Sequence, residues 1–372
     1  MGIKRMAPAP QALRDIQPKF KQPWTIPEHD IISLPKDEFS MLRLEDILII
    51  GAGTSSCVPH VACLAEETPR CTVCMDAVGL LDRSVEYTAR YGGPSLGSTS
   101  PSRNKRTNPS AILRYRHREG GVRSVLFDCG KSFYSNTNTM LEAGVRELDG
   151  VVLTHGHADA ILGLDDLRHW SGAHPTIQPT VEVWCDQETF EVVKGVFPYL
   201  VDPKRATGGG AVSALHFNIF APGDIITVGD LQIQTIKLVH GAHFDGRPYH
   251  ANGFICEGLT YLSDLSSLPP ESMAVLQSAP NDILVVDCLF ENRPYPSHYG
   301  WPQAKELHTL LRPRLSILVG MSHHSDYYQF QRRIDKEFGF ALNPTGVIEK
   351  LEYAKGRVLV GFDGMLLRIS SD

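Results

Sequence analysis

The amino-acid sequence predicts an α/β protein in which two β-sheets pack face to face with helices on the outside. A series of short, apolar, strand-like runs extends from residue 46 almost to the C-terminal end. Helical stretches are interspersed among these runs, a pattern typical of layered α/β folds. The 372 residues suffice for one large domain of this kind, and their ordinary apolar content allows a sizeable core.

The chain begins with a region that has no clear period. Residues 1–44 are rich in proline and charge, so we expect an N-terminal extended arm that packs loosely or is disordered. The domain proper is expected to span residues 45–372 and to open with a buried strand, Asp46–Ile50, which runs into the tight turn Gly51–Ser56. Glycine, serine, proline and basic residues indicate an insertion at 79–108.

Strands and helices then alternate along the rest of the domain, with no internal repeat of fixed period. We expect strands at Ser110–Tyr115, Ser124–Asp128, Gly150–Thr154, Thr180–Trp184, Leu231–Leu238, Gly253–Ile255, Leu259–Ser263, Ile283–Asp287, Leu315–Val319, Arg357–Val360 and Leu366–Ile369. We expect helices at Ser132–Ala143, Ile161–Trp170, Gln187–Val196, Gln303–Leu311 and Tyr327–Phe338.

Charge and hydropathy narrow the range of partners. The formal net charge of −6 argues against nucleic acid, which requires a basic surface, and we expect the basic run Arg103–Arg106 to be solvated. No apolar run approaches the ~18 residues of a membrane span, and no apolar core follows Lys4 and Arg5 as it would in a secretory signal. We therefore expect a cytoplasmic protein, with a nuclear location as the alternative. The sequence is compatible with either a monomer or a homodimer.

The strongest motif is His155-Gly-His157-Ala-Asp159, which follows the strand ending at Thr154. In extended backbone, residues two apart project from the same side, so the two imidazoles face the same way. Two imidazoles and a nearby carboxylate suit Zn²⁺, Mn²⁺ or Fe²⁺. The motif therefore predicts a divalent metal at the end of this strand.

Further polar residues follow later strands. His240, Asp264 and His323 each come after a strand-like run, and His298 lies in a proline-rich loop after another. Side chains at strand ends that meet at one edge of a sheet are the usual construction of an α/β active site. We interpret them as one set, although each alone is more often a solvated loop residue.

These motifs together resemble the metallo-β-lactamase superfamily and, within it, the PhnP-like cyclic phosphodiesterases. The resemblance covers the chain from Asp46 to its end and implies the αββα sandwich of that superfamily. It rests on the His155–Asp159 motif, Leu238-Val-His240-Gly, Tyr261-Leu-Ser-Asp264, Val286-Asp287, His298 and Gly361-Phe-Asp-Gly-Met365.

The resemblance also implies roles for individual residues. His155, His157 and His240 would hold the first metal, and Asp264 would be the carboxylate that bridges two metals. Asp159 would belong to the second metal site, or would hold the attacking water as general base. His298 matches a histidine thought to be the proton donor of PhnP-like enzymes.

Two departures from the family pattern affect the second metal site. Ala160 stands where the superfamily motif has its last histidine, and Gly320 stands where PhnP-like enzymes take another. We therefore expect one tightly held catalytic metal and a weak or empty second site. Asp165 or Asp166 is a substitute ligand, a group that orients a ligand histidine, or half of a charge pair at a helix start. Arg168 either meets a substrate phosphate or forms a surface salt bridge.

A second cluster consists of Cys63 and the pair Cys71-Thr-Val-Cys74. The pair follows a glycine-rich turn and a loop, which favours zinc binding over a redox role. By resemblance to PhnP-like proteins, His323 would complete a structural zinc site, with His324 as the alternative ligand. Cys57 is a spare. The four later cysteines are expected to be small buried core residues: Cys129, Cys185, Cys256 and Cys288.

The predicted activity is hydrolysis of a small or cyclic phosphodiester by a metal-activated water. Three alternatives use the same fold: thioester or lactone hydrolysis, tRNase Z-like RNA cleavage, and a metal-binding protein without activity. Fold alone does not choose among them. His243 and His250 flank an insertion after His240 and are either solvated loop residues or further active-site groups.

Overall fold

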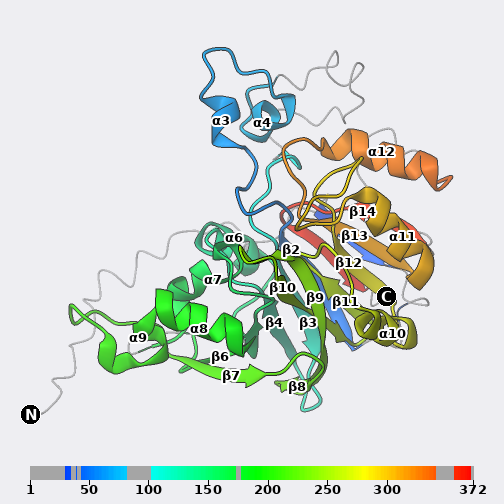
Figure 1. Cartoon of the computed structure of the whole chain (residues 1–372). Helices are drawn as coiled ribbons and strands as arrows, with labels where there is room; N and C mark the ends of the chain where they lie inside the picture. Colours follow the sequence, from blue (N-terminus) through cyan, green and yellow to red (C-terminus); the bar gives the residue numbers. More distant parts are fainter. Residues whose placement is uncertain are drawn as a thin grey trace, which may run out of the picture.

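In the computed structural model, two β-sheets pack face to face and helices cover their outer surfaces (Figure 1). The predicted α/β sandwich is confirmed. Most of the predicted N-terminal arm and residues 82–101 of the predicted insertion lie outside the described part of the chain. The described residues are 30–34, 39, 43–81, 102–172, 177–340 and 356–369.

The first sheet has the strand order β1-β15-β2-β3-β4-β5-β6-β7. Strands β15, β2, β3 and β4 are antiparallel to their neighbours in this series, whereas β4 to β7 are parallel. Its strands are β1 (Ile31–Leu34), β2 (Leu44–Gly51), β3 (Ser110–Arg116), β4 (Val122–Phe127), β5 (Gly150–Val152), β6 (Val181–Asp186), β7 (Leu215–Phe220) and β15 (Met365–Ile369).

The second sheet has the order β14-β13-β12-β11-β10-β9-β8. Strands β8 to β11 are antiparallel, and β11 to β14 are parallel. Parallel strands bring their carboxyl ends to one edge of the sheet, so residues that follow β11, β12 and β13 meet there. Its strands are β8 (Ile225–Val228), β9 (Leu231–Ala242), β10 (Pro248–Cys256), β11 (Leu259–Leu262), β12 (Ile283–Asp287), β13 (Leu315–Val319) and β14 (Arg357–Val360).

The helices form the outer layers, with α6 to α9 beside the first sheet and α10 to α12 beside the second (Figure 1). Helices α3 and α4 belong to a separate protrusion at the top of the view. The described helices are α3 (Val61–Leu64), α4 (Thr72–Ala77), α6 (Phe133–Glu142), α7 (Ala158–Ile161), the 3₁₀ helix η2 (Leu162–His169), α8 (Gln187–Val196), α9 (Pro198–Val201), the 3₁₀ helix η3 (Pro203–Arg205), α10 (Pro270–Ser278), α11 (Trp301–Leu311) and α12 (Tyr327–Glu337).

Strand β2 shows how an unbroken apolar run builds this sandwich. Successive side chains of a strand point to opposite faces. Ile47 and Ile49 pack in the core between the two sheets, whereas Leu48 and Ile50 pack in the core between the first sheet and its helices. Both faces of β2 are covered, which explains why its sequence is apolar throughout.

The predicted arm is not loose along its whole length. Ile31–Leu34 form β1, an edge strand that pairs in parallel with β15, and Ile32 and Leu34 are buried. This alternation of buried and half-buried residues is the pattern of a strand with one covered face. The sequence also did not predict β7, β8 or α10. The predicted helix at 161–170 is instead the short α7 followed by η2.

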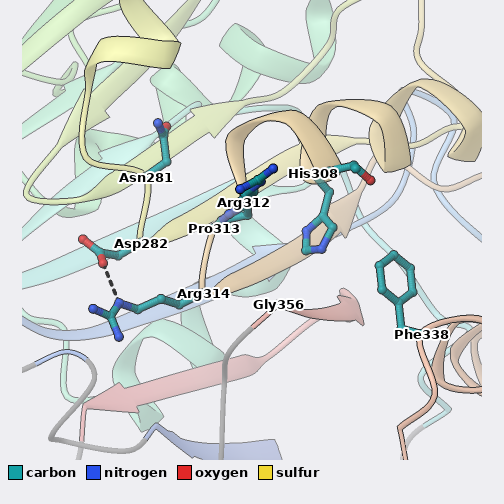
Figure 2. Close-up of a pocket in the computed structure, with 9 residues that line it drawn as sticks. Asn281, Asp282, His308, Arg312, Pro313, Arg314, Phe338 and Gly356 are labelled. Carbon is teal, nitrogen blue, oxygen red and sulfur yellow. Dashed lines mark hydrogen bonds and ion pairs between the residues drawn. The ribbon is translucent and has the colours of Figure 1, made fainter.

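A cavity of about 850 Å³ lies at the amino ends of β12, β13 and β14, away from the predicted site (Figure 2). Arg314 Nε donates to Asp282 Oδ1 at 2.8 Å on its wall, and His308 and Phe338 also line it. Although this cavity is larger than the one at the histidines, none of its lining residues belongs to a potential metal cluster of the described chain. The metal-ligating residues gather at the opposite ends of these strands.

Candidate metal centre

The carboxyl ends of strands from both sheets supply the side chains that could bind a metal. His155 and His157 follow β5 of the first sheet, while His240 lies near the end of β9 and Asp264 follows β11 in the second. Asp264 has a φ of +58°, in the left-handed region that L-residues rarely adopt. Such a backbone conformation at a functional position turns the side chain toward its partners at this edge.

The three histidines converge on one point. His157 Nδ1 lies 3.2 Å from His240 Nε2, and His155 Nε2 lies 3.6 Å from Asp264 Oδ2. His155 Nε2 is buried and has no hydrogen-bond partner within the described chain. A buried polar atom without a partner is costly, and a cation held between these nitrogens and the carboxylate would satisfy it. The donor set of imidazoles and a carboxylate therefore fits a divalent metal.

Hydrogen bonds behind the site fix the orientation of two of these histidines. His155 Nδ1 lies 2.8 Å from Thr154 Oγ1, which in turn lies 2.9 Å from the carboxylate of Asp128. His240 Nδ1 lies 2.7 Å from the carbonyl oxygen of Ser297. A carbonyl can only accept, so His240 Nδ1 carries its proton and its Nε2 lone pair faces the cluster. The hydrogen-bond chain from Asp128 through Thr154 likewise places the proton of His155 on Nδ1 and leaves its Nε2 lone pair facing the cluster.

Burial favours the protonation states that metal binding needs at the histidines. Burial lowers the pKa of His155 well below its ordinary value and lowers that of His157 as well. Both imidazoles are therefore neutral near pH 7, as ligands must be. Burial raises the pKa of Asp159 and of Asp264, because desolvation disfavours a charged carboxylate. The charge of Asp264 raises the pKa of Asp159 further, and the charge of Asp287 acts in the same direction on Asp264.

Asp159, at the start of α7, joins the cluster from the side of the first sheet. Its carboxylate lies within 4.8 Å of ligand atoms of His155 and Asp264. Ala160 follows it, and Gly320 occupies the edge of the second sheet with a φ of +76°. A Cβ atom at Gly320 would lie 2.4 Å from Asp287 Oδ1. The carboxylate of Asp287 thus takes the space into which a histidine at residue 320 would extend.

Asp287 and His298 form a pair beside the metal cluster. His298 Nδ1 lies 2.8 Å from Asp287 Oδ2 and 3.9 Å from Asp264 Oδ1. Burial lowers the pKa of His298, but the charge and hydrogen bond of Asp287 outweigh burial and raise the pKa to about 9. His298 therefore carries a proton at neutral pH. Asp287 belongs to one of the motifs that carry the family resemblance, but no role in the site was predicted for it from sequence.

These groups surround a cavity of about 430 Å³. None of its lining residues is lysine or arginine, so the positive charge within the described cavity comes from His298 and from any bound metal. The predicted additional group His243 lines the cavity, whereas His250 Nδ1 lies 3.2 Å from the carbonyl of Leu238. The lining residues are Ser55, His157, Asp159, His240, Gly241, Ala242, His243, Tyr249, Asp264, Ser297 and His298.

The helical residues after α7 do not reach this cavity. Arg168, the predicted phosphate contact, pairs with Asp165 and is not among the lining residues. Tyr199 also donates to Asp165, at 3.0 Å. Neither Asp165 nor Asp166 belongs to a potential metal cluster in the described chain. The geometry therefore matches the salt-bridge interpretation of Arg168 and Asp165, and does not match a substitute ligand.

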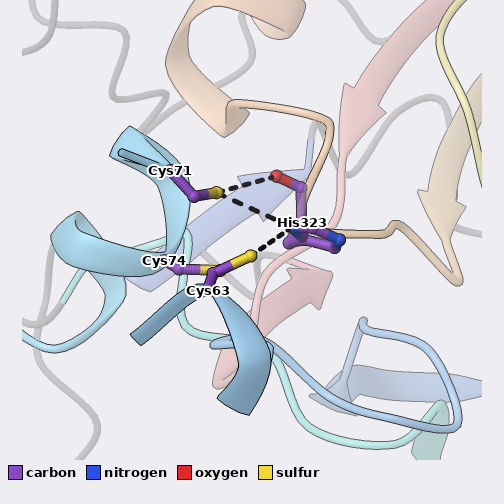
Figure 3. A group of neighbouring side chains, drawn as sticks. All are labelled: Cys63, Cys71, Cys74 and His323. Carbon is purple, nitrogen blue, oxygen red and sulfur yellow. Dashed lines mark hydrogen bonds between the residues drawn. The ribbon is translucent and has the colours of Figure 1, made fainter. Parts of the chain in front are cut away.

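A second cluster brings together Cys63, Cys71, Cys74 and His323 (Figure 3). His323 Nδ1 lies 3.4 Å from the sulfur of Cys63 and 3.6 Å from that of Cys71. Three thiols and one imidazole form a donor set typical of structural zinc. His324 and the spare Cys57 are not part of the cluster. The sequence analysis missed His60, whose ring stacks on His323 with the ring centroids 4.9 Å apart.

The two arginines of the basic run Arg103–Arg106 are not solvated, which corrects the expectation from sequence, whereas Lys105 is exposed as expected. The exposed fractions of Arg103 and Arg106 are 4% and 0%. Arg106 Nη2 donates to the carbonyl oxygen of Ser325 at 2.6 Å, and the guanidinium of Arg103 lies over the ring of Phe362. Backbone carbonyls and an aromatic face satisfy these cations, which would otherwise be too costly to bury. Arg106 thereby holds the loop that carries His323.

Comparison with known proteins agrees with this geometry. The profile of the beta-lactamase superfamily domain matches residues 123–321, more than half of the chain. The chain belongs to the beta-lactamase superfamily. The match includes the motif at His155, the strand end at His240 and the carboxylates Asp264 and Asp287. The superfamily resemblance inferred from the motifs is confirmed.

Solved structures place the fold more closely. A diphosphatase of the PhnP family superposes with a TM-score of 0.61 at 23% identity, over 87% of this chain and 98% of that one. The short form of human tRNase Z gives a TM-score of 0.46 at 14% identity, over 88% and 100%. The likeness to the diphosphatase shows a shared fold and, at this identity, nothing about the substrate.

A curated relative comes from Porphyromonas gingivalis and is named an octanoyltransferase. It is 25% identical over 284 residues, which make up 76% of this chain and 47% of the relative. This chain thus spans about half the length of that protein.

Among the described residues, no helix is both long and apolar enough to cross a lipid bilayer.

Proposed function

We propose that this protein is a metal-dependent phosphodiesterase that hydrolyses a small or cyclic phosphodiester of the cytoplasm. The observation that carries the proposal is the arrangement of the cavity. The metal-ligating cluster of histidines and Asp264 lies beside the protonated pair of His298 and Asp287. A hydrolase of a diester needs both parts, one to supply the nucleophile and one to protonate the departing oxygen.

His155, His157, His240 and Asp264 would hold the metal. When bound, it would activate a water molecule and polarise a phosphoryl oxygen. Asp159 lines the cavity and would accept the proton of the attacking water. The missing histidines at Ala160 and Gly320 support a single catalytic metal, of which Zn²⁺, Mn²⁺ and Fe²⁺ are candidates.

His298 would act on the other oxygen. With its Nδ1 bonded to Asp287, Nε2 is the nitrogen left to donate a proton to the leaving group. The leaving group of a small or cyclic diester is an alkoxide, which is a strong base and departs slowly without a proton. A histidine that holds its proton at neutral pH is suited to this step.

The charge of the cavity favours a diester over a more highly charged substrate. A phosphodiester carries one negative charge, whereas a phosphomonoester or diphosphate carries two or more near neutral pH. One metal and one imidazolium suffice for a monoanion, and no lysine or arginine lines the described cavity to meet further charge. Because Arg168 lies elsewhere, we do not include it among the groups that bind substrate.

The test compares three substrates with the metal-loaded protein. We expect hydrolysis of bis(p-nitrophenyl) phosphate with a higher kcat/KM than that of p-nitrophenyl phosphate, and loss of both activities in His155→Ala. An octanoyl thioester is the third substrate, because the Porphyromonas relative is named for octanoyl transfer. Cleavage of the thioester alone would identify the protein as a thioester hydrolase. Metal binding without turnover of any ester would identify it as a metal-binding protein without catalytic activity.

The second part of the proposal is a structural zinc at Cys63, Cys71, Cys74 and His323. Elemental analysis of the purified protein should find about two metals per chain, one at each cluster. His155→Ala and Cys74→Ala should each remove one of them. About three metals per chain would mean that the second catalytic site is occupied despite Ala160 and Gly320, and would overturn the single-metal mechanism.

A further inference from the structure

His157 differs from the other two histidines of the metal centre in how it is held. His157 is exposed, whereas His155 and His240 are buried. The Nδ1 atoms of those two rings are fixed by Thr154 and by the carbonyl of Ser297. His157 turns its Nδ1 toward the cluster, and within the described chain no group forms a hydrogen bond with its Nε2. Metal-binding histidines almost always have such a partner, in the protein or as water, but no protein hydrogen bond of the described chain fixes the plane of this ring.

Tyr249 contacts the ring of His157 instead. Its ring stacks on the ring of His157 with the centroids 4.7 Å apart and the planes 16° from parallel. The hydroxyl of Tyr249 accepts a hydrogen bond from the backbone N–H of Gly156 at 3.2 Å. Tyr249 is thus anchored to the same loop that carries His155 and His157. One side chain of β10 therefore contacts both the ring of His157 and the backbone beside it.

An irregularity in the second sheet aims Tyr249 at this position. The pairing of β9 with β10 slips between Ala242↔Pro248 and Val239↔His250, so that His240 and Gly241 lie opposite the single residue Tyr249. Gly241 has a φ of +76°, which a residue with a side chain rarely adopts. Bulges of this kind redirect side chains beside active sites. Here the rings of His240 and Tyr249 lie 6.0 Å apart on the same side.

We propose that Tyr249 is the positioning residue of His157, performing by ring stacking what hydrogen bonds perform for His155 and His240. The inference rests on the metal centre of the proposed function and adds a residue that neither the motifs nor the family profile assigns. Tyr249 also lines the cavity, so loss of its ring would free His157 to rotate away from the metal and into the open space.

The experiment measures metal affinity at the histidine site in three variants. Tyr249→Leu removes the stacking ring and should weaken metal binding about 10- to 100-fold, the range found when a partner that orients a metal ligand is lost. Tyr249→Phe keeps the ring and loses only one hydrogen-bond acceptor, so its affinity should stay within roughly fivefold of wild type. Phe244→Leu, in the fully exposed turn of the same hairpin, is the matched control and should bind metal as wild type does.

Competition with a chromophoric chelator gives the affinity, and the visible spectrum of the Co²⁺-substituted protein reports ligand geometry independently of activity. Retention of zinc at the cysteine cluster shows that each variant is folded. Should Tyr249→Leu fail to fold, Tyr249→Met replaces it with a flexible chain of similar length. Wild-type affinity and an unchanged Co²⁺ spectrum in the folded variant would overturn the inference, as would an equal loss in Phe244→Leu. Absence of metal from the histidine site of the wild-type protein would instead defeat the proposed function.

Discussion

Thr154→Val removes one hydroxyl from behind the metal centre and leaves the shape of the side chain almost unchanged. The hydroxyl accepts from His155 Nδ1 at 2.8 Å and donates to the buried carboxylate of Asp128 at 2.9 Å. Valine can do neither. The proton on His155 Nδ1 then has no acceptor, so the imidazole is free to hold its proton on Nε2, the atom that should bind the metal.

Two effects follow in sizes that can be measured. Loss of the partner that orients His155 should weaken metal binding by about 10- to 100-fold. In free energy this is about 1.4 to 2.8 kcal/mol. The metal-free protein should also lose about 1–3 kcal/mol of its free energy of unfolding, because a buried imidazole N–H and a buried carboxylate each lose a partner. The backbone N–H of Thr154, which donates to Asp128 at 2.8 Å, remains and limits the second effect.

Chelator competition measures the first effect, and urea unfolding of the metal-free protein measures the second. Zinc at the cysteine cluster is the internal reference, because that cluster lies apart from Thr154. Thr154→Ser retains a hydroxyl and should restore most of the lost affinity. If Thr154→Val bound metal as tightly as wild type, the hydrogen-bond chain would not be what orients His155.

Three further variants test the proton donor, the thiol cluster and the buried arginine. Asp287→Asn should lower the pKa of His298, so that less of it is protonated at neutral pH, and should slow cleavage of alkyl diesters by about 10²-fold. Diesters that release p-nitrophenolate should lose far less, and equal losses would contradict the role. Cys74→Ser should remove one zinc and lower the midpoint of thermal unfolding without emptying the histidine site; retention of that zinc would refute the cluster. Arg106→Met should reduce the free energy of unfolding by roughly 3 kcal/mol, because its hydrogen bonds to carbonyls are lost. In the control variant Arg123→Met, at an exposed arginine, the free energy of unfolding should stay within about 0.5 kcal/mol of wild type. Equal losses in the two variants would show that the buried contacts of Arg106 do not stabilise the fold.

The sequence predicted the sheets, and the residues that gather at the two candidate metal sites, well where the local pattern carried the information. Ile283–Asp287 and Leu315–Val319 are strands with the predicted bounds, because apolar runs of this length are buried on both faces. His155 and His157 share a short motif, and His240, Asp264 and His323 each follow a recognisable strand. Such signals depend on neighbours along the chain and survive in a single sequence.

The residues that the sequence left out depend on contacts between distant segments. Tyr249 has no motif of its own and reaches His157 only because β9 and β10 slip by one residue. Arg106 looks like a solvated cation until the loop at Ser325 folds over it. The short strands β7 and β8 are partly exposed, so their apolar pattern is too weak to distinguish a strand from a loop.

Strand β1 has a consequence for how the chain can be shortened. Residues 31–34 form the outer strand of the first sheet and satisfy one side of β15 along its length. A chain that began at residue 45, the boundary suggested by composition, would leave the N–H and C=O groups on that side of β15 without partners. Exposed strand edges recruit other chains into continuous sheets and promote aggregation. Four residues of the N-terminal arm therefore cover the backbone edge of β15, and a truncation that looks harmless in the sequence is expected to promote aggregation.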